Sequence, residues 1–357
     1  MKKILLSLSF VALSLSINAQ TFQNDNFNSL TIGNVGTDFT GTTPGQNSWS
    51  TFSTNVNSAT STTSTSTNAG NSNFQIVANG NSSTNGFSLE TPNGNEGARY
   101  MWKEGFDTFW ASRTAGNNRV EVQYDIFSGP TTTSKGQVSV RLFALDGTTS
   151  RTVSGFNYTL DTKVLSGLAY LNNGGTYGTF LVNLDTAGAL TLAPNTWYTI
   201  GFGYDTVTGA PYWRINTTTA SFSVNPANYA GPYQPVEVDF IGLTVATNTV
   251  AGTNTFDNFT VKATSGDSLL GNDEFATIAQ DVISVYPNPA KDVINVNSSI
   301  NSFNSVSIVD LNGRVVKSLN FNAVTEAQIN ISDLASGIYV MNINSEKETF
   351  SKKIVIE

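Results

Sequence analysis

The feature that most constrains the fold is a two-residue alternation of apolar and polar side chains that recurs between residues 120 and 240. Because successive side chains of a strand point to opposite faces, each such stretch predicts a strand with one buried face. No stretch of helical length carries apolar residues at the 3.6-residue spacing of a helix. The pattern predicts an all-β fold, with one large β-sandwich over residues 20–263. The alternating apolar positions are Val120, Val122, Tyr124 and Ile126; Val138, Val140, Leu142 and Ala144; Tyr198, Ile200, Phe202 and Tyr204; and Val236, Val238 and Phe240.

The absence of two residue types excludes several kinds of catalytic and metal-binding site. The 357 residues include neither Cys nor His. The chain therefore has no disulfide, no thiol nucleophile, no Ser-His-Asp triad and no imidazole or thiolate ligand for zinc. Catalysis would have to rest on Asp, Glu, Tyr, Lys, Arg or an oxygen-ligated ion. The formal charge of −8 argues against nucleic acid as a partner, because nucleic-acid binding requires clusters of Lys and Arg.

The N-terminus has the pattern of an export signal. Lys2 and Lys3 precede an apolar run over residues 4–17, which is shorter than the about 20 residues that a membrane-spanning helix needs. A basic start, a short apolar stretch and a small residue predict a signal peptide over residues 1–19, cut between Ala19 and Gln20. An uncleaved membrane anchor is the alternative. No later segment is apolar enough to cross a membrane, so we expect no transmembrane segment in the mature chain.

Residues 284–357 predict a second, smaller sandwich. A turn with two prolines precedes an alternating strand, and an Asn-Gly pair further on predicts a hairpin. The motifs YPNPAKDVINV, VDLNGRVV, ISDLASGIYV and KKIVIE resemble, in order and spacing, the type A C-terminal sorting domain of type IX secretion substrates. The positions that carry the resemblance are Tyr286, Pro287, Asn288, Pro289, Asp310, Gly313, Gly337, Tyr339, Lys352 and Lys353.

This resemblance implies an Ig-like β-sandwich that is recognised by the type IX secretion machinery. It also implies a sortase that removes the domain, so that the protein is secreted or attached to the cell surface. An Ig-like adhesive module is the alternative. Residues 264–283 are acidic and rich in turn residues, and we expect them to form the linker.

Motifs at both ends of residues 20–263 indicate which sandwich this region forms. Residues 195–215 predict two strands joined by a turn at 205–209, and resemble a hairpin of the concanavalin A-like jelly roll, the fold of laminin-G domains and legume lectins. The segment after Phe256 resembles the closing strand of such domains, and the segment after Asp25 resembles the opening strand. The first and last strands of that fold are neighbours. We therefore expect a jelly-roll β-sandwich.

One strand carries two carboxylates that are candidates for catalysis. Glu237 and Asp239 resemble the first two positions of the E-x-D-x-x-E strand of laminarinase-type glycoside hydrolases. The third position, which would hold the acid/base, is Gly242. The alternative, which we favour, is an ordinary strand with Val236, Val238 and Phe240 in the core and the two carboxylates on the other face.

Calcium and sugar are the expected ligand classes. Hard oxygen ligands suit an acidic extracellular protein, and the resemblance nominates Asp25 and Asp257, on the first and last strands, for a structural Ca²⁺. Asp257 with Asn258 could instead simply turn the strand. A sugar ring stacks on an exposed aromatic ring while its hydroxyls take polar partners. The candidate rings are Trp102, Trp110, Tyr212, Trp213 and Tyr233.

The sequence thus predicts a secreted or surface-displayed protein whose central domain binds extracellular polysaccharide. An enzyme that degrades polysaccharide, by hydrolysis or by elimination, is one alternative. A structural adhesin or matrix component is the other.

Overall fold

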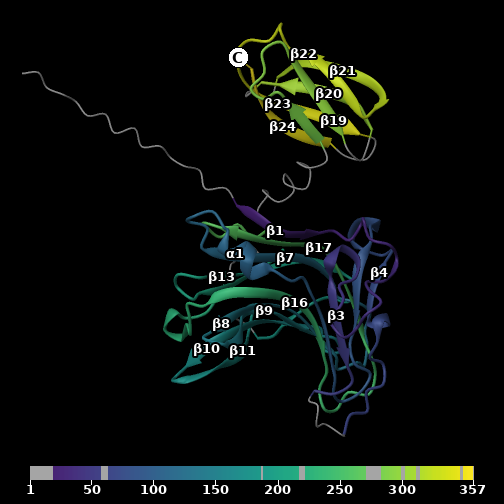
Figure 1. The fold of residues 1–357 in the computed structure, drawn as a ribbon, viewed down its shortest axis with the longest axis vertical. Helices are drawn as coiled ribbons and strands as arrows, with labels where there is room; N and C mark the ends of the chain where they lie inside the picture. Colours follow the sequence, from purple (N-terminus) through teal and green to yellow (C-terminus); the bar gives the residue numbers. More distant parts are fainter. Residues whose placement is uncertain are drawn as a thin grey trace, which may run out of the picture. The chain divides into compact units, whose positions relative to one another are not determined.

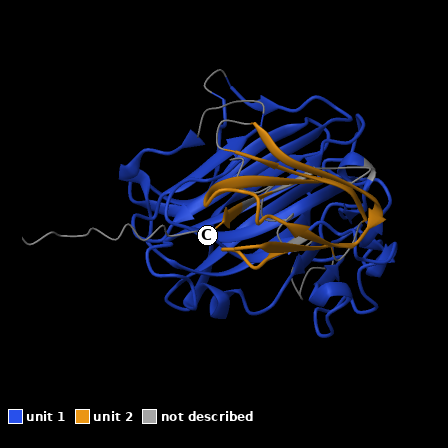
Figure 2. Cartoon of the chain, turned by 90° about the horizontal axis from the view of Figure 1, so that it is seen from above, with its two compact units in different colours: residues 1–270 blue, residues 271–357 orange. Residues whose placement is uncertain are grey.

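The computed structural model describes residues 19–57, 63–185, 188–216, 222–270, 283–298, 302–310, 314–345 and 349–356. The chain divides into two compact units, a central unit ending at Leu270 and a C-terminal unit beginning at Gly271, which Figure 2 shows in different colours. Both units are built from antiparallel strands, so the predicted all-β class is confirmed. The helices among the described residues are short: α1 (Phe106–Ala111), η1 (Gln46–Ser48), η2 (Asn71–Asn73), η3 (Asn81–Ser83) and η4 (Pro226–Asn228).

Sheet A of the central unit has the strand order β15-β14-β13-β7-β17-β5-β4-β2, with β1 paired to β17. The first and last strands of the unit are therefore neighbours, as predicted, and Asp25 lies opposite Phe259. The strands are β1 (Gln20–Asp25), β2 (Gly33–Asn34), β4 (Phe74–Val77), β5 (Gly86–Glu90), β7 (Arg119–Phe127), β13 (Trp197–Asp205), β14 (Pro211–Ile215), β15 (Phe222–Ser223) and β17 (Thr253–Thr264).

Sheet B has the order β11-β10-β9-β8-β16-β6-β3, with β12 paired to β10. The chain crosses from one sheet to the other several times, for example from β5 to β6 to β7 and from β16 to β17, which is the jelly-roll arrangement (Figure 1). The strands are β3 (Ser50–Thr54), β6 (Ala98–Trp102), β8 (Gln137–Asp146), β9 (Thr149–Thr159), β10 (Val164–Asn173), β11 (Thr176–Val182), β12 (Leu190–Thr191) and β16 (Gln234–Leu243).

The core lies between the two sheets and is rich in aromatic rings. Phe240 of sheet B lies 5.3 Å from Phe87 and 5.1 Å from Phe256 of sheet A, measured between ring centroids. Trp213 of β14 reaches across the core, where its indole N–H donates to the carbonyl of Gly155 in β9 at 2.6 Å. Each fully buried Phe contributes about 1.5–3 kcal/mol through removal of apolar surface from water. These contacts fix which faces of the two sheets point inward.

The alternation predicted for strand 236–240 is confirmed with one difference. Val238 and Phe240 are fully buried, and the carboxylates of Glu237 and Asp239 lie on the outer face of sheet B. Val236, which we expected in the core, is only half-buried. The register of β16 against β8 shifts between Pro235 and Glu237, and such a bulge moves a side chain out of the regular alternation.

Residues 264–270, which the sequence assigned to the linker, lie against sheet A. The Ser268 N–H and hydroxyl both donate to the Glu121 carboxylate, at 2.8 and 2.6 Å, and the Leu270 N–H donates to the Gln123 side chain at 2.8 Å. The Leu269 side chain is buried against Gly201, where an added Cβ would approach Leu269 to 2.8 Å. We call residues 264–270 the strap.

The C-terminal unit is a small sandwich of two sheets. Sheet C has the order β18-β19-β22, and sheet D has the order β21-β20-β23-β24. The turn after Tyr286 is tied to the last strand, because the Asn288 side chain accepts the Val355 N–H at 2.8 Å and the Ala290 N–H donates to the Val355 carbonyl at 2.9 Å. The strands are β18 (Ile283–Tyr286), β19 (Val293–Ser298), β20 (Phe303–Val309), β21 (Val315–Val324), β22 (Glu326–Asn330), β23 (Gly337–Ser345) and β24 (Thr349–Ile356).

Candidate functional site

The outer face of sheet B carries a hollow of about 300 Å³ where β3, β6 and β16 run side by side. The strand register places these side chains: Asp239 lies opposite Trp102, and Ser50 lies opposite Trp102 on its other side. Asp239 also lies opposite Arg141 of β8. The residues that line the hollow are Phe52, Tyr100, Trp102, Glu104, Glu237 and Asp239.

The Trp102 ring is held in place from two sides. Its indole N–H donates to the Glu104 carboxylate at 2.6 Å. The ring packs on Gly41, where an added Cβ would lie 2.8 Å from the ring and where φ is +81°. A side chain at position 41 would be sterically strained and would displace the ring. Loop residue Gly41 and Glu104 therefore fix one aromatic wall of the hollow.

Glu237 and Asp239 form a hydrogen-bonded carboxyl pair. Burial, and then the neighbouring Glu237, raise the pKa of Asp239 well above its usual range. Burial and the nearby Glu104 raise the pKa of Glu237, while the hydrogen bond from Asp239 opposes that rise. Both carboxyls are therefore harder to ionise than isolated ones, because two adjacent buried carboxylates cannot both ionise at low cost.

Two further polar groups complete the site. Arg141 lies in β8 opposite Asp239, and burial lowers the pKa of the Arg141 guanidinium. Burial also raises the pKa of Tyr100. The Asp239 Oδ1 and the Arg141 Nε have no hydrogen-bond partner, and Asp239 is only 5% exposed. A buried polar atom without a partner costs about 1–3 kcal/mol, so this part of the site has unused capacity to bind a polar ligand.

The hollow continues in both directions along the surface. Phe52 and Tyr100 also line an adjacent depression of about 650 Å³ that extends over Leu243 and Thr244. Glu104 lines a third depression, of about 410 Å³, on the other side. Each neighbour shares at least one residue with the central hollow, so the three depressions adjoin one another, and we refer to them together as the groove.

Three of the predicted ligand rings belong to the core instead. Trp213 is fully buried, and Trp110 and Tyr212 are 3% and 7% exposed. Trp213 bridges the two sheets, Trp110 of α1 packs edge-on against Phe22, and the Tyr212 hydroxyl donates to the buried Glu121 carboxylate at 3.0 Å. The expectation that these three rings face a ligand was wrong, because neighbouring parts of the central unit bury each of them. Of the predicted rings only Trp102 lines the groove.

Tyr233 lies apart from the groove, just before β16. It is half-buried and its ring lies 6.1 Å from that of Tyr170. Its backbone N–H donates to the Tyr204 hydroxyl at 2.9 Å. The structure therefore does not bring Tyr233 together with Trp102.

The two predicted calcium ligands take different partners. Asp25 accepts hydrogen bonds from the Trp49 indole N–H and the Asn47 amide, both at 2.7 Å, and lies 3.3 Å from the Lys103 ammonium. Asp257 accepts from the Thr84 hydroxyl and the Asn81 N–H, both at 2.8 Å. Over the described ranges, no group of three or more acidic side chains is arranged to hold a metal ion. Structural calcium stays a prediction.

Sequence reasoning missed three residues that line the groove, Phe52, Tyr100 and Glu104, and the neighbouring Arg141. Tyr100 and Trp102 occupy alternate positions in the short stretch Arg-Tyr-Met-Trp. That alternation could have indicated a strand with two rings on one face. No local pattern could have paired that strand with the one carrying Asp239, because the pairing is set by the order of strands in the sheet.

The residues of the sorting motif lie at turns and strand starts of the C-terminal unit. Tyr286, Pro287, Asn288 and Pro289 are exposed, Gly337 opens β23, and the Tyr339 hydroxyl donates to the Ala335 carbonyl at 2.8 Å. Asp310 receives the Arg314 N–H at 3.0 Å, which joins β20 to β21 as the predicted hairpin. Lys352 lies in β24. Gly313, the side chain of Lys353 and residues 1–18 lie outside what the structure describes. Ala19 precedes β1, which begins at Gln20; the signal cleavage stays a prediction.

The fold and these motifs define a class: an all-β protein made of a jelly-roll unit and a C-terminal export unit. Residues 284–357 match the family described as the secretion system C-terminal sorting domain. The domain indicates export by type IX secretion, to the cell surface or into the medium, and interaction with that machinery. In the described part of the chain, no helix has the length and apolar character needed to cross a bilayer.

Comparison with known proteins adds no close relative of the central unit. No curated protein matches the chain. Among solved structures, an alginate lyase from Chlorella virus matches at 10% identity and a TM-score of 0.37, covering 53% of this chain and 88% of the lyase. A carbohydrate recognition domain matches at 9% identity and a TM-score of 0.34, covering 64% and 93%. A sialidase matches at 10% identity and a TM-score of 0.32, covering 58% of this chain and 18% of the sialidase.

Proposed function

We propose that the groove on the outer face of sheet B binds an extended segment of an extracellular polysaccharide. The observation that carries this proposal is the composition of the central hollow, in which three aromatic rings and three carboxyl groups face one space. Rings stack on the apolar faces of sugars, and carboxyl groups accept hydrogen bonds from sugar hydroxyls. The continuous groove supports a polymer, rather than a single sugar, as the ligand.

The unused polar atoms indicate how a sugar hydroxyl would bind. The Asp239 Oδ1 is an acceptor and the Arg141 Nε–H is a donor, and neither has a hydrogen-bond partner. A hydroxyl can donate to the first and accept from the second. Such a group would replace the missing partners of both buried atoms.

The test is a glycan-array screen of the full chain, followed by titration calorimetry on any glycan that binds. Trp102→Ala should weaken binding about tenfold or more, because about 1.4 kcal/mol of stacking energy corresponds to one decade in affinity. Trp197→Ala is the matched control, since Trp197 is also half-buried but lies in sheet A against Phe127. Equal affinity of the Trp102 and Trp197 variants would refute the groove as the site. Running both titrations with calcium and with EDTA tests the predicted ion.

A second candidate function is cleavage of the bound polysaccharide. The observation that favours it is the pair of Glu237 and Asp239, which line the same hollow and whose pKa values are both raised, because paired carboxyls with displaced pKa values are the usual acid and base in glycoside cleavage. The position of the missing third carboxyl of the E-x-D-x-x-E pattern is Gly242, whereas Glu104 supplies a carboxyl from the turn after β6. Glu104 is therefore the group most able to act across the sugar from Glu237.

Cleavage is tested by incubating the full chain with each glycan that binds and measuring new reducing ends. If the chain is an enzyme, Glu237→Gln should abolish turnover while leaving binding within about threefold of wild type. Elimination leaves an unsaturated uronate at the new chain end, so the appearance of its ultraviolet absorbance would identify elimination instead of hydrolysis. If every glycan that binds stays intact under all conditions in which the protein remains folded, the function is binding without cleavage.

A further inference from the structure

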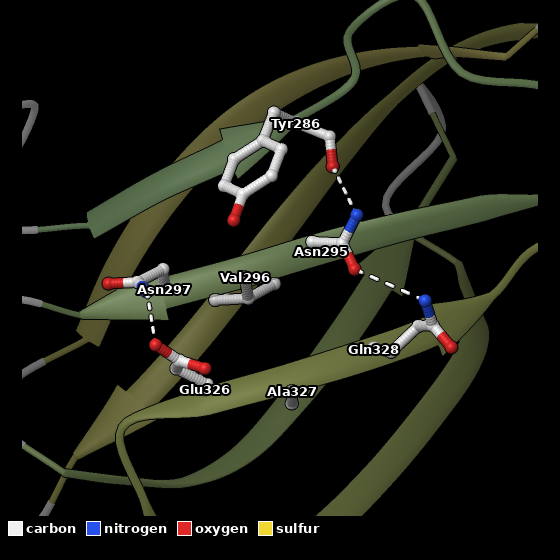
Figure 3. A pocket seen from close by; sticks show the side chains of 7 residues that line it. All are labelled: Tyr286, Asn295, Val296, Asn297, Glu326, Ala327 and Gln328. Carbon is white, nitrogen blue, oxygen red and sulfur yellow. Dashed lines mark hydrogen bonds between the residues drawn. The ribbon is translucent and has the colours of Figure 1, made fainter.

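We infer that the C-terminal unit has a sugar-binding site of its own, on the outer face of sheet C, that accepts one pyranose ring. A groove of about 190 Å³ lies there, lined by Tyr286, Asn295, Val296, Asn297, Glu326, Ala327 and Gln328 (Figure 3). This site is separate from the groove of the central unit and does not depend on the proposed function above.

The register of sheet C places the polar side chains of this groove in two rows. Tyr286 of β18, Asn295 of β19 and Gln328 of β22 lie opposite one another across the three strands. Asn297 and Glu326 form the second row. The backbone of Val296 and Ala327 lies between the rows, because both side chains pack towards the core, which leaves the hollow visible in Figure 3.

The aromatic ring of Tyr286 forms one wall of the groove. Tyr286 is 51% exposed, although burying a Tyr ring is favourable. Because the turn that follows it is tied to β24 through Asn288, the backbone on the C-terminal side of Tyr286 is fixed. An exposed and positioned ring beside hydrogen-bonding groups has the composition of a sugar platform.

The amides and the carboxylate are already oriented by one another. The Asn295 amide donates to the Tyr286 carbonyl at 3.2 Å, and the Gln328 amide donates to the Asn295 side-chain oxygen at 3.3 Å. The Asn297 amide donates to Glu326 Oε1 at 2.7 Å. A primary amide offers two donors and a carboxylate about four acceptor positions, so Gln328 and Glu326 have capacity left for neighbouring hydroxyls of a ligand.

The size of the groove limits the ligand. Small-molecule pockets commonly measure about 300–1,000 Å³, and this groove is smaller and open to solvent. It therefore accommodates a single sugar ring, which can be a terminal residue of a longer chain. The centre of a protein interface is depleted in charged side chains, whereas this groove contains the carboxylate of Glu326, so the observations favour a sugar over a protein at this groove.

The experiment is saturation-transfer NMR on the full chain carrying Trp102→Ala, so that binding at the central groove is weakened. The probes are methyl β-D-glucopyranoside, methyl β-D-galactopyranoside and methyl α-D-mannopyranoside. We expect transfer to at least one probe, a loss of about tenfold in affinity with Tyr286→Ala, and near wild-type affinity with Tyr286→Phe, which keeps the ring. Gln328→Ala, an exposed position, should weaken binding without disturbing the fold.

Tyr177→Ala is the matched control, because Tyr177 is similarly exposed, at 55%, but belongs to the central unit. Absence of transfer to all three probes would overturn the inference. So would transfer that is unchanged by Tyr286→Ala. An export defect of Tyr286→Ala in cells, together with no sugar binding, would assign the groove to a protein of the secretion machinery and likewise overturn it.

Discussion

Replacing Asp25 by Ala should destabilise the central unit strongly, because this carboxylate is the acceptor for donors from several segments. It receives the Phe27 N–H at 2.9 Å as well as the Trp49 indole N–H. Phe27 and Trp49 are both fully buried. The variant would leave these two donors without an acceptor and the Lys103 ammonium without its ion pair.

The magnitude follows from the two buried donors. An unsatisfied buried donor costs about 1–3 kcal/mol, so the pair gives a loss of about 4 kcal/mol. The Asn47 amide and Lys103 are less deeply buried and can turn towards water, so they add little. The assay is urea unfolding followed by tryptophan fluorescence. All five tryptophans lie between residues 49 and 213, so the signal reports the central unit alone.

The control is Asp107→Ala, an exposed carboxylate in the first turn of α1, for which we expect a loss below about 1 kcal/mol. A loss below about 1 kcal/mol for Asp25→Ala as well would refute the reasoning from buried donors. The measurement is made in calcium and in EGTA. If calcium stabilised the wild type but not the Asp25 variant, the residue would be an ion ligand, as first predicted from the sequence.

Three further predictions test other parts of the molecule. Burial raises the pKa of Asp257 from 3.8 to about 6, so the folded state binds a proton more tightly than the unfolded state. The free energy of unfolding should therefore fall as pH rises from about 4 to 6. Asp257→Asn should reduce this fall, as measured by urea midpoints at pH 4 and pH 7. Gly41→Ala should displace the Trp102 ring and weaken glycan binding about tenfold, and unchanged affinity would contradict the role of Gly41 as a wall of the groove. Deletion of residues 284–357 should leave the protein in the periplasm with the near-ultraviolet spectrum of its central unit intact, and normal surface delivery of the truncated chain would contradict the sorting function.

The alternation of apolar residues was enough to predict most long strands and the class of fold. It succeeded because each strand of a sandwich buries one face, so burial leaves a period of two in the sequence. The neighbouring positions of β1 and β17 were predicted only through resemblance to a known fold, since no local pattern links Asp25 to Phe259. The predicted hairpin at residues 195–215 is confirmed by the pairing of β13 with β14.

The site was harder to predict because rings in the core and rings on the surface have the same local pattern. Trp213 and Trp102 both occupy strand positions, and only the stacking of one sheet on the other decides that the first is buried. Glu237 and Asp239 were correctly placed on the outer face. Their position beside Trp102 follows from the pairing of β16 with β6, which is far away in sequence.

The strap has a consequence for anyone who transfers the export signal to a foreign cargo. A fusion protein that takes the export signal from residue 264 onward would separate Ser268 from the Glu121 carboxylate. It would also separate Leu269 from Gly201, against which it packs. The same cut would remove both Ser268 donors from Glu121 and uncover the backbone of Gly201 in sheet A. A portable tag taken from this chain should therefore begin at Gly271, and a stable stand-alone jelly roll should end at Leu270.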